Sequence, residues 1–135
     1  RYGFIRQAVV TSAAAPDGRQ LKALVTTDNL SSEVWADSAY RSTRNENWLA
    51  GRMLTSRIHR RKPAGKPMPS ATAQANAKKS SVRAAVEHVF AHQKMRFGLF
   101  IRTIGLDRAE AKLTLANLAY NFDRLIFHER RAARG

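Results

Sequence analysis

The stretch EVWADSAY, residues 33–40, decides how the rest of this chain can be arranged. Its apolar run Val34–Ala36 ends at a carboxylate, Asp37, and a polar loop follows. A short apolar run bounded by polar residues is typical of a buried strand. Sheets that alternate with helices usually carry functional groups at the carboxyl ends of their strands, so Asp37 is a candidate functional carboxylate. The simpler alternative is that Asp37 only caps a turn.

Strand and helix patterns alternate on both sides of this stretch. Residues 4–12 are apolar and partly β-branched, which predicts a strand, and Ser56–Arg60 is interpreted as another short strand. Helices are expected over about Thr43–Leu54, Ser80–Phe97 and Arg108–Glu129. This order of elements predicts an α/β fold, a sheet flanked by helices.

Two further patterns complete the expected organisation. Three prolines and a glycine interrupt regular structure after Arg61, which predicts a basic Pro/Gly-rich loop over residues 62–77. The last expected helix presents one apolar face that we interpret as part of the core. The residues of that face are Leu115, Leu118, Phe122 and Leu125.

The composition describes one strongly basic domain. The chain has 135 residues, with 24 Lys and Arg against 10 Asp and Glu, which gives a formal net charge of +14. It has no cysteine, so disulfides, thiolate zinc sites and cysteine nucleophiles are excluded. No apolar run approaches the ~20 residues that span a bilayer, so no membrane partner is expected.

The positive charge is concentrated in the middle of the chain. Residues 47–106 hold 12 Lys or Arg and a single acid, Glu87. A stretch of this kind favours binding to nucleic-acid phosphates with little base discrimination, although a solvated basic face is the alternative. The candidate DNA-binding residues in it are Arg57, Arg60, Arg61 and Lys62. His59 lies among them and is interpreted as a further phosphate contact.

Three charged residues share one stripe of the helix around Glu87. At about 100° per residue, Glu87 lies about 40° and Lys94 about 20° from Arg83, beside the apolar face of the helix. A carboxylate between two cations at the edge of a core is suited to holding a metal ion or a phosphate. An ordinary Arg–Glu surface pair is the alternative. Taken together, Asp37 and Glu87 fit the oxygen-ligand chemistry of Mg²⁺.

These motifs resemble those of a known family. The segment VWADSAY, residues 34–40, looks like the strand that carries the second Asp of bacterial insertion-sequence transposases of the DDE type. Arg83, then three residues, Glu87, six residues and Lys94 is similar to the Arg–Glu–Lys signature of the same family. The resemblance is to insertion-sequence family five and covers essentially the whole chain.

The resemblance implies an RNase H-like fold with a mixed sheet flanked by helices, here incomplete at its N-terminus. It implies DNA strand cleavage and transfer with two divalent ions, Mg²⁺ or Mn²⁺. Asp37 would be the second acid and Glu87 the third, both as metal ligands, while Arg83 and Lys94 would bind DNA phosphates or order the site. The implied partners are transposon ends and target DNA. The implied full-length protein is a homodimer in the bacterial cytoplasm, associated with the nucleoid.

Two departures from the family pattern shape the expectation. Ser80 stands where many members have Tyr, three residues before the Arg. The only aspartates before Asp37 are Asp17, in a turn, and Asp28, in a loop. Because the first catalytic Asp of the family lies on a strand, neither is assigned to that role. We therefore expect residues 1–135 to be a truncated, C-terminal part of the catalytic domain. The alternative function is a non-catalytic basic domain that only binds nucleic acid.

Overall fold

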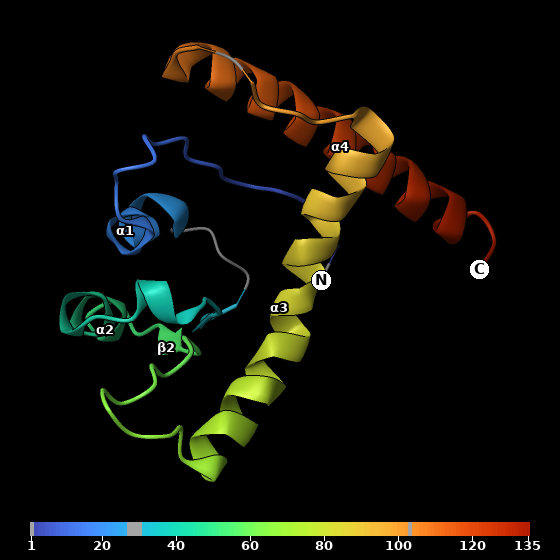
Figure 1. Ribbon diagram of the computed structural model, residues 1–135. Coiled ribbons are helices and arrows are strands. Elements are labelled where there is room, and N and C mark those ends of the chain that lie inside the picture. Colours follow the sequence, from blue (N-terminus) through green and yellow to red (C-terminus); the bar gives the residue numbers. More distant parts are fainter. Residues whose placement is uncertain (1, 27–30, 103) are drawn as a thin grey trace. The chain divides into compact units, whose positions relative to one another are not determined.

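The computed structural model describes residues 2–26, 31–102 and 104–135 (Figure 1). It contains both helices and a small sheet. In chain order the elements are the 3₁₀ helix η1 (Asp17–Gln20), α1 (Leu21–Leu24), β1 (Glu33–Val34), the 3₁₀ helix η2 (Ser38–Tyr40), α2 (Thr43–Ala50), β2 (Thr55–Ser56), α3 (Ser70–Phe97) and α4 (Leu106–Ala132).

The chain divides into two compact units, which are described separately. The sheet unit comprises residues 13–84, and the helical unit comprises residues 1–12 with 85–135. The division falls within α3.

Among the described residues, no helix combines the length and the apolar character that crossing a membrane would require.

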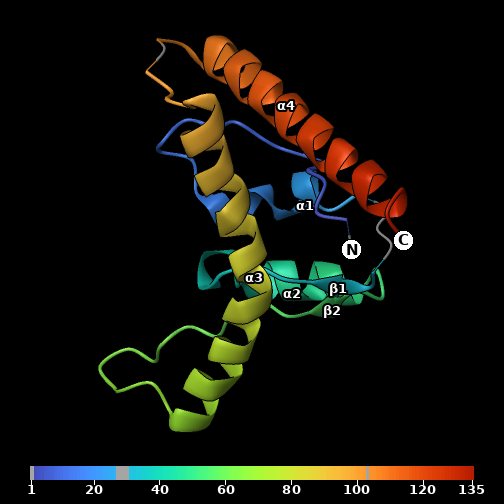
Figure 2. The ribbon, with the colours of Figure 1, turned by 90° about the vertical axis from the view of Figure 1, so that its right-hand side faces the viewer.

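The sheet unit is built on a short parallel pair of strands. Val34 of β1 pairs with Ser56 of β2, and Figure 2 shows the two strands running together beside α2. Backbone bonding continues past the strands, because the His59 amide donates to the Ala36 carbonyl at 3.0 Å. Side chains from both sides of the pair form the core of the unit. These are Leu21, Val34, Leu49 and Ile58.

The buried side-chain amide of Asn45 connects the 3₁₀ helices η1 and η2 to the start of α2. Asn45 lies on α2, is 5% exposed, and donates from Nδ2 to the carbonyls of Gly18 at 2.8 Å and Tyr40 at 2.7 Å. Ser42 caps the same helix by accepting the Asn45 backbone N–H at 3.2 Å. Buried polar groups in folded proteins nearly always have hydrogen-bond partners, as the Asn45 amide does here. Asn45 therefore holds η1 and η2 against the start of α2.

Gly18 is required where η1 meets η2. A Cβ placed on Gly18 would lie 2.6 Å from the Ala39 carbonyl oxygen, far inside van der Waals contact. Only a residue without a side chain permits this approach. The two turns can therefore close on each other only with glycine at this position.

The helical unit packs α4 against the N-terminal segment and the end of α3. Asn121 on α4 pairs with both backbone groups of Ile5, with two bonds of 2.8 Å, and the two segments lie together in Figure 2. Gln93 of α3 donates to Asn117 of α4 at 2.8 Å. Side-chain amides thus connect the parts of this unit.

The predicted strand over residues 4–12 is wrong, because this segment is extended but forms no strand. A strand needs a backbone partner, and at Ile5 the partner is the Asn121 side chain. The predicted loop over residues 62–77 is too long, because α3 begins at Ser70. The last proline, Pro69, precedes the helix, and the segment that follows, SATAQANA, is rich in the strong helix former alanine.

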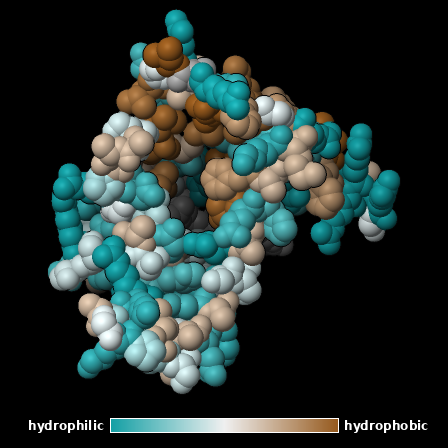
Figure 3. Space-filling view, in the orientation of Figure 1, coloured by the Kyte–Doolittle hydropathy of each residue, from teal (hydrophilic) through white to brown (hydrophobic). Residues whose placement is uncertain are grey.

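The predicted core face of the last helix is also wrong. Leu115 is 67% exposed, and its companions on that face are exposed as well, whereas Ala109, Ala116 and Tyr120 are the buried residues of α4. Figure 3 shows apolar side chains gathered at the surface toward the top of the view, where Figure 1 places the first half of α4. The buried side of this helix, formed by two alanines and a tyrosine, is therefore not its most apolar side.

The Asn45 amide provides the test of this fold. Replacement of Asn45 by Ala leaves the Gly18 and Tyr40 carbonyls without their donor, and we expect it to reduce the free energy of unfolding by about 2–3 kcal/mol. Denaturant unfolding of the chain measures the change. The matched control is Asn47→Ala on the exposed side of the same helix, expected within about 0.5 kcal/mol of the unchanged chain. Equal losses in the two variants would contradict the assigned role.

Candidate functional site

Asp37 lies beyond the paired strands and is the N-cap residue of η2. Its Oδ1 accepts the Ala39 backbone N–H at 2.8 Å, so the carboxylate caps the turn. Its Oδ2 lies 3.5 Å from Nη1 of Arg83 on α3, and the Asp37 side chain is 43% exposed. The capping role and the accessible carboxylate therefore occur together. The structure brings together two of the predicted site residues, Asp37 and Arg83.

Arg61 supports the turn that follows Asp37. Its guanidinium donates to the carbonyl of Ser38 at 2.8 Å and to that of Ala39 at 3.3 Å. Two carbonyls bound by one planar guanidinium restrict the turn more than a single bond would. Arg61 was predicted as a DNA-binding residue, and the structure gives it this intramolecular role.

A third backbone carbonyl of the sheet unit is bound by two cations. The Ile58 carbonyl accepts Nη1 of Arg41 at 3.1 Å and Nζ of Lys79 at 2.9 Å. Burial lowers the pKa of Lys79, and the positive charges of Arg41, Arg60 and Arg57 act in the same direction. Lys79 lies four residues before Arg83 on α3, so spacing along the helix could have identified it. Neither Arg41 nor Lys79 is predicted as a site residue from the sequence.

His59 and Tyr40 report the environment of Asp37. Burial lowers the pKa of His59, Arg83 and Lys79 lower it further, and Asp37 opposes them. The Nε2 atom of His59 is buried without a hydrogen-bond partner in the part of the chain that the structure describes. Burial raises the pKa of Tyr40, and the carboxylates of Asp17 and Asp37 raise it further. Both residues therefore respond to the charge of Asp37, His59 together with two cations and Tyr40 together with a second carboxylate.

The other predicted DNA-binding residues of this unit differ in their surroundings. Arg57 forms an ion pair with Glu33, with Nη2 2.7 Å and Nε 2.9 Å from the same oxygen, so its charge is balanced within the sheet unit. Arg60 is exposed and its backbone pairs with the Asn76 side chain at 3.0 and 2.9 Å. Lys62 is exposed on the loop before α3. Arg60 and Lys62 are therefore the more accessible cations of the predicted set.

Glu87 and Lys94 belong to the helical unit. Both are exposed on α3, where Glu87 follows Arg83 by four residues, about one turn of helix. Among the described residues, no group of three or more His, Asp or Glu side chains is placed to hold a metal ion. By itself, Asp37 offers a half-exposed carboxylate, the ligand type that Mg²⁺ prefers, so it fits one position in the coordination of such an ion.

Comparison with known proteins identifies a family. A family model described as the transposase DDE domain matches residues 1–122. No curated protein and no solved structure matches the chain. The matched range includes Asp37, Arg83, Glu87 and Lys94.

The lowered pKa of His59 predicts a pH-dependent stability. In the unfolded chain His59 takes up its proton near the ordinary pKa of about 6.5, whereas in the folded chain it does so at lower pH. Its contribution to stability is therefore complete above about pH 6.5 and is lost as the pH falls toward the folded pKa. We expect the free energy of unfolding to decrease between pH 7.5 and 5.5, and to decrease less in His59→Gln. His88→Gln, at an exposed histidine, is the matched control, and identical slopes in both variants would reject this assignment.

Proposed function

The chain belongs to the transposase DDE domain family, and from this premise we propose that it serves metal-dependent cleavage and transfer of DNA strands in an insertion-sequence element. The observation that carries the proposal is the Asp37 carboxylate, which lies three residues after the end of β1 and 3.5 Å from Arg83. Functional groups at strand ends are typical of sheets that alternate with helices. We propose an RNase H-like fold for the same domain, which the parallel pairing of β1 and β2 supports.

Asp37 and Glu87 are the proposed metal ligands of this chain, acting as the second and third acids of the triad. Two divalent ions, Mg²⁺ or Mn²⁺, activate an attacking oxygen and stabilise a leaving oxygen when they are bound. The protein contributes by holding the Asp37 carboxylate in a fixed position. Oδ1 of Asp37 is held by the Ala39 N–H, and Arg61 holds the carbonyls of the same turn.

Arg83 and Lys94 are the proposed phosphate contacts of the signature. Arg83 is 32% exposed and its distance to Asp37 is long for a charge-assisted bond. A partly exposed ion pair of this kind contributes about 0–1 kcal/mol. The Arg83 contact with Asp37 is therefore weak enough to be replaced by a contact with a DNA phosphate. Lys94 lies farther along the same helix and would extend the contact with the DNA strand.

The first acid of the triad is proposed to come from outside residues 1–135. Asp17 begins the 3₁₀ helix η1 and does not end a strand, and Asp28 lies outside the described residues. On this proposal the chain is a C-terminal portion of the catalytic domain. The complete protein would act on transposon ends and target DNA as a homodimer, in the bacterial cytoplasm with the nucleoid.

The acid pair is tested by separating chemistry from binding. In the complete transposase, Asp37→Asn and Glu87→Gln are each expected to reduce strand transfer by at least about 10³-fold, because a metal ligand is lost, while DNA retention changes little. Strand transfer is measured on a labelled transposon end and retention by gel shift. Glu110→Gln, an exposed acid on α4, is the matched control and should retain activity. Full activity of Glu87→Gln would reject Glu87 as a metal ligand, whereas DNA retention without any strand transfer by the unchanged protein would favour a domain that only binds nucleic acid.

The accessible cations are tested through the salt dependence of binding. Replacing Arg60 and Lys62 together by Gln is expected to weaken DNA binding and to lower the slope of log Kd against log salt by up to about 1.8, about 0.9 for each phosphate contact. Arg57→Gln should change the slope less, because Arg57 is paired with Glu33. A slope that is unchanged in the double variant would exclude this pair as a DNA contact.

A further inference from the structure

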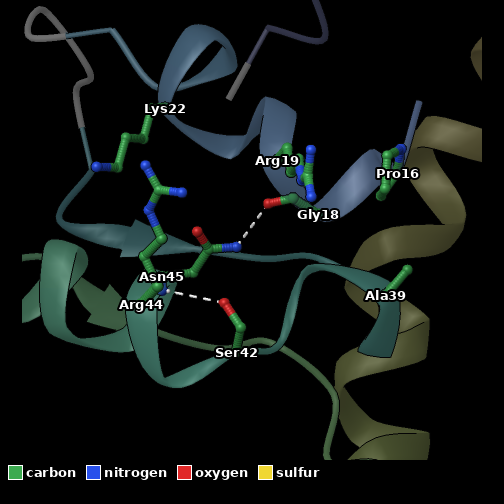
Figure 4. A pocket seen from close by; sticks show the side chains of 8 residues that line it. All are labelled: Pro16, Gly18, Arg19, Lys22, Ala39, Ser42, Arg44 and Asn45. Atoms are coloured by element: carbon green, nitrogen blue, oxygen red, sulfur yellow. Dashed lines mark hydrogen bonds between the residues drawn. The ribbon is translucent and has the colours of Figure 1, made fainter. Parts of the chain in front are cut away.

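A basic cavity lies on the sheet unit, where η1 and η2 meet the start of α2. Its volume is about 310 Å³. Three cationic side chains line it, Arg19 and Lys22 from the segment η1–α1 and Arg44 from α2. Figure 4 shows Lys22 and Arg44 extending their charged ends to the same side, with Arg19 beyond Gly18. None of these three residues belongs to the basic stretch that the sequence singled out.

Positive charge predominates among the residues that line this cavity. No acidic side chain lines it, and within the described ranges none forms an ion pair with Arg19, Lys22 or Arg44. Lys22 Nζ lies 5.9 Å from the Trp48 ring, which favours a defined position for the ammonium group. Three like charges around one opening raise the local potential and attract an anion.

The polar floor of the cavity is already ordered. Asn45 is buried and its Nδ2 is bound to the Gly18 carbonyl, while Ser42 accepts the Asn45 N–H. Figure 4 shows both bonds as dashed lines. A ligand would therefore need to order only the long cationic side chains, which limits the entropy that binding costs.

We propose that this cavity binds backbone phosphates of a DNA strand. The inference rests on the proposed function, which supplies DNA as the anion, and adds a contact site to it. Ala39 lines the cavity and also donates its N–H to Asp37, so the cavity and the carboxylate share one turn. Phosphates recur at short intervals along a strand. We therefore expect one strand to contact both the cavity and the turn that carries Asp37.

The test compares two triple variants that remove the same charge. Arg19→Gln, Lys22→Gln and Arg44→Gln together are expected to lower the slope of log Kd against log salt by up to about 2.7, about 0.9 for each phosphate. The matched control replaces Arg130, Arg131 and Arg134, exposed cations near the C-terminus, by Gln and should lower the slope less. An unchanged slope, or an equal change in both triple variants, overturns the proposal. The single variant Arg44→Gln, expected to lower the slope by up to about 0.9, applies the same test if the triple variant fails to fold.

A competition experiment identifies the source of the phosphate. Inorganic phosphate replaces chloride at constant ionic strength while DNA retention is measured. Retention that is unchanged supports a site for a DNA strand. Loss of retention that occurs in the unchanged chain but not in the triple variant indicates a site for free phosphate and overturns the proposal. If the unchanged chain retains no DNA at all, the proposed function fails, whereas a failed slope comparison with normal retention rejects only the cavity.

Discussion

Two hydrogen bonds from the Asn45 amide are the constraint on which the sheet unit depends. They join the carbonyls of Gly18 and Tyr40, which are distant from each other in sequence, and the amide itself is buried. The turn that ends at Tyr40 begins immediately after Asp37. The position of the carboxylate therefore follows from a side chain that has no chemistry of its own.

Part of the positive charge of the chain stabilises the fold itself. Arg41, Arg61 and Lys79 donate to backbone carbonyls, and Arg57 neutralises Glu33. These cations stabilise turns and strand ends near Asp37. Net charge therefore overstates what is available for nucleic acid. The proposed DNA contacts include Arg60 and Lys62, whose side chains have no such partner among the described residues, and Arg83, which is paired with Asp37.

The sequence predicted the parts of the fold that local patterns determine. A strand forms before Asp37 as expected, although it ends at Val34, and α2 begins at the predicted residue, Thr43. The start of α3 was placed ten residues late, because alanine content after Pro69 matters more there than apolar periodicity. For the site, the Asp37–Arg83 contact joins positions far apart in the chain, and no spacing rule could supply it. The ion pair of Arg57 and the hydrogen bonds of Arg61 could not be predicted for the same reason. Their partners, an acid and backbone carbonyls, belong to another segment of the chain.

The contact at Gly18 has a consequence for how natural variation in this protein should be interpreted. Its α-carbon hydrogen faces the Ala39 oxygen at a separation that a methyl group cannot share. A single added carbon would push apart the loops on which the carboxylate stands. Substitutions at position 18 are thus expected to be lost from functional copies of the gene for a steric reason, although glycine has no side chain that could touch a substrate.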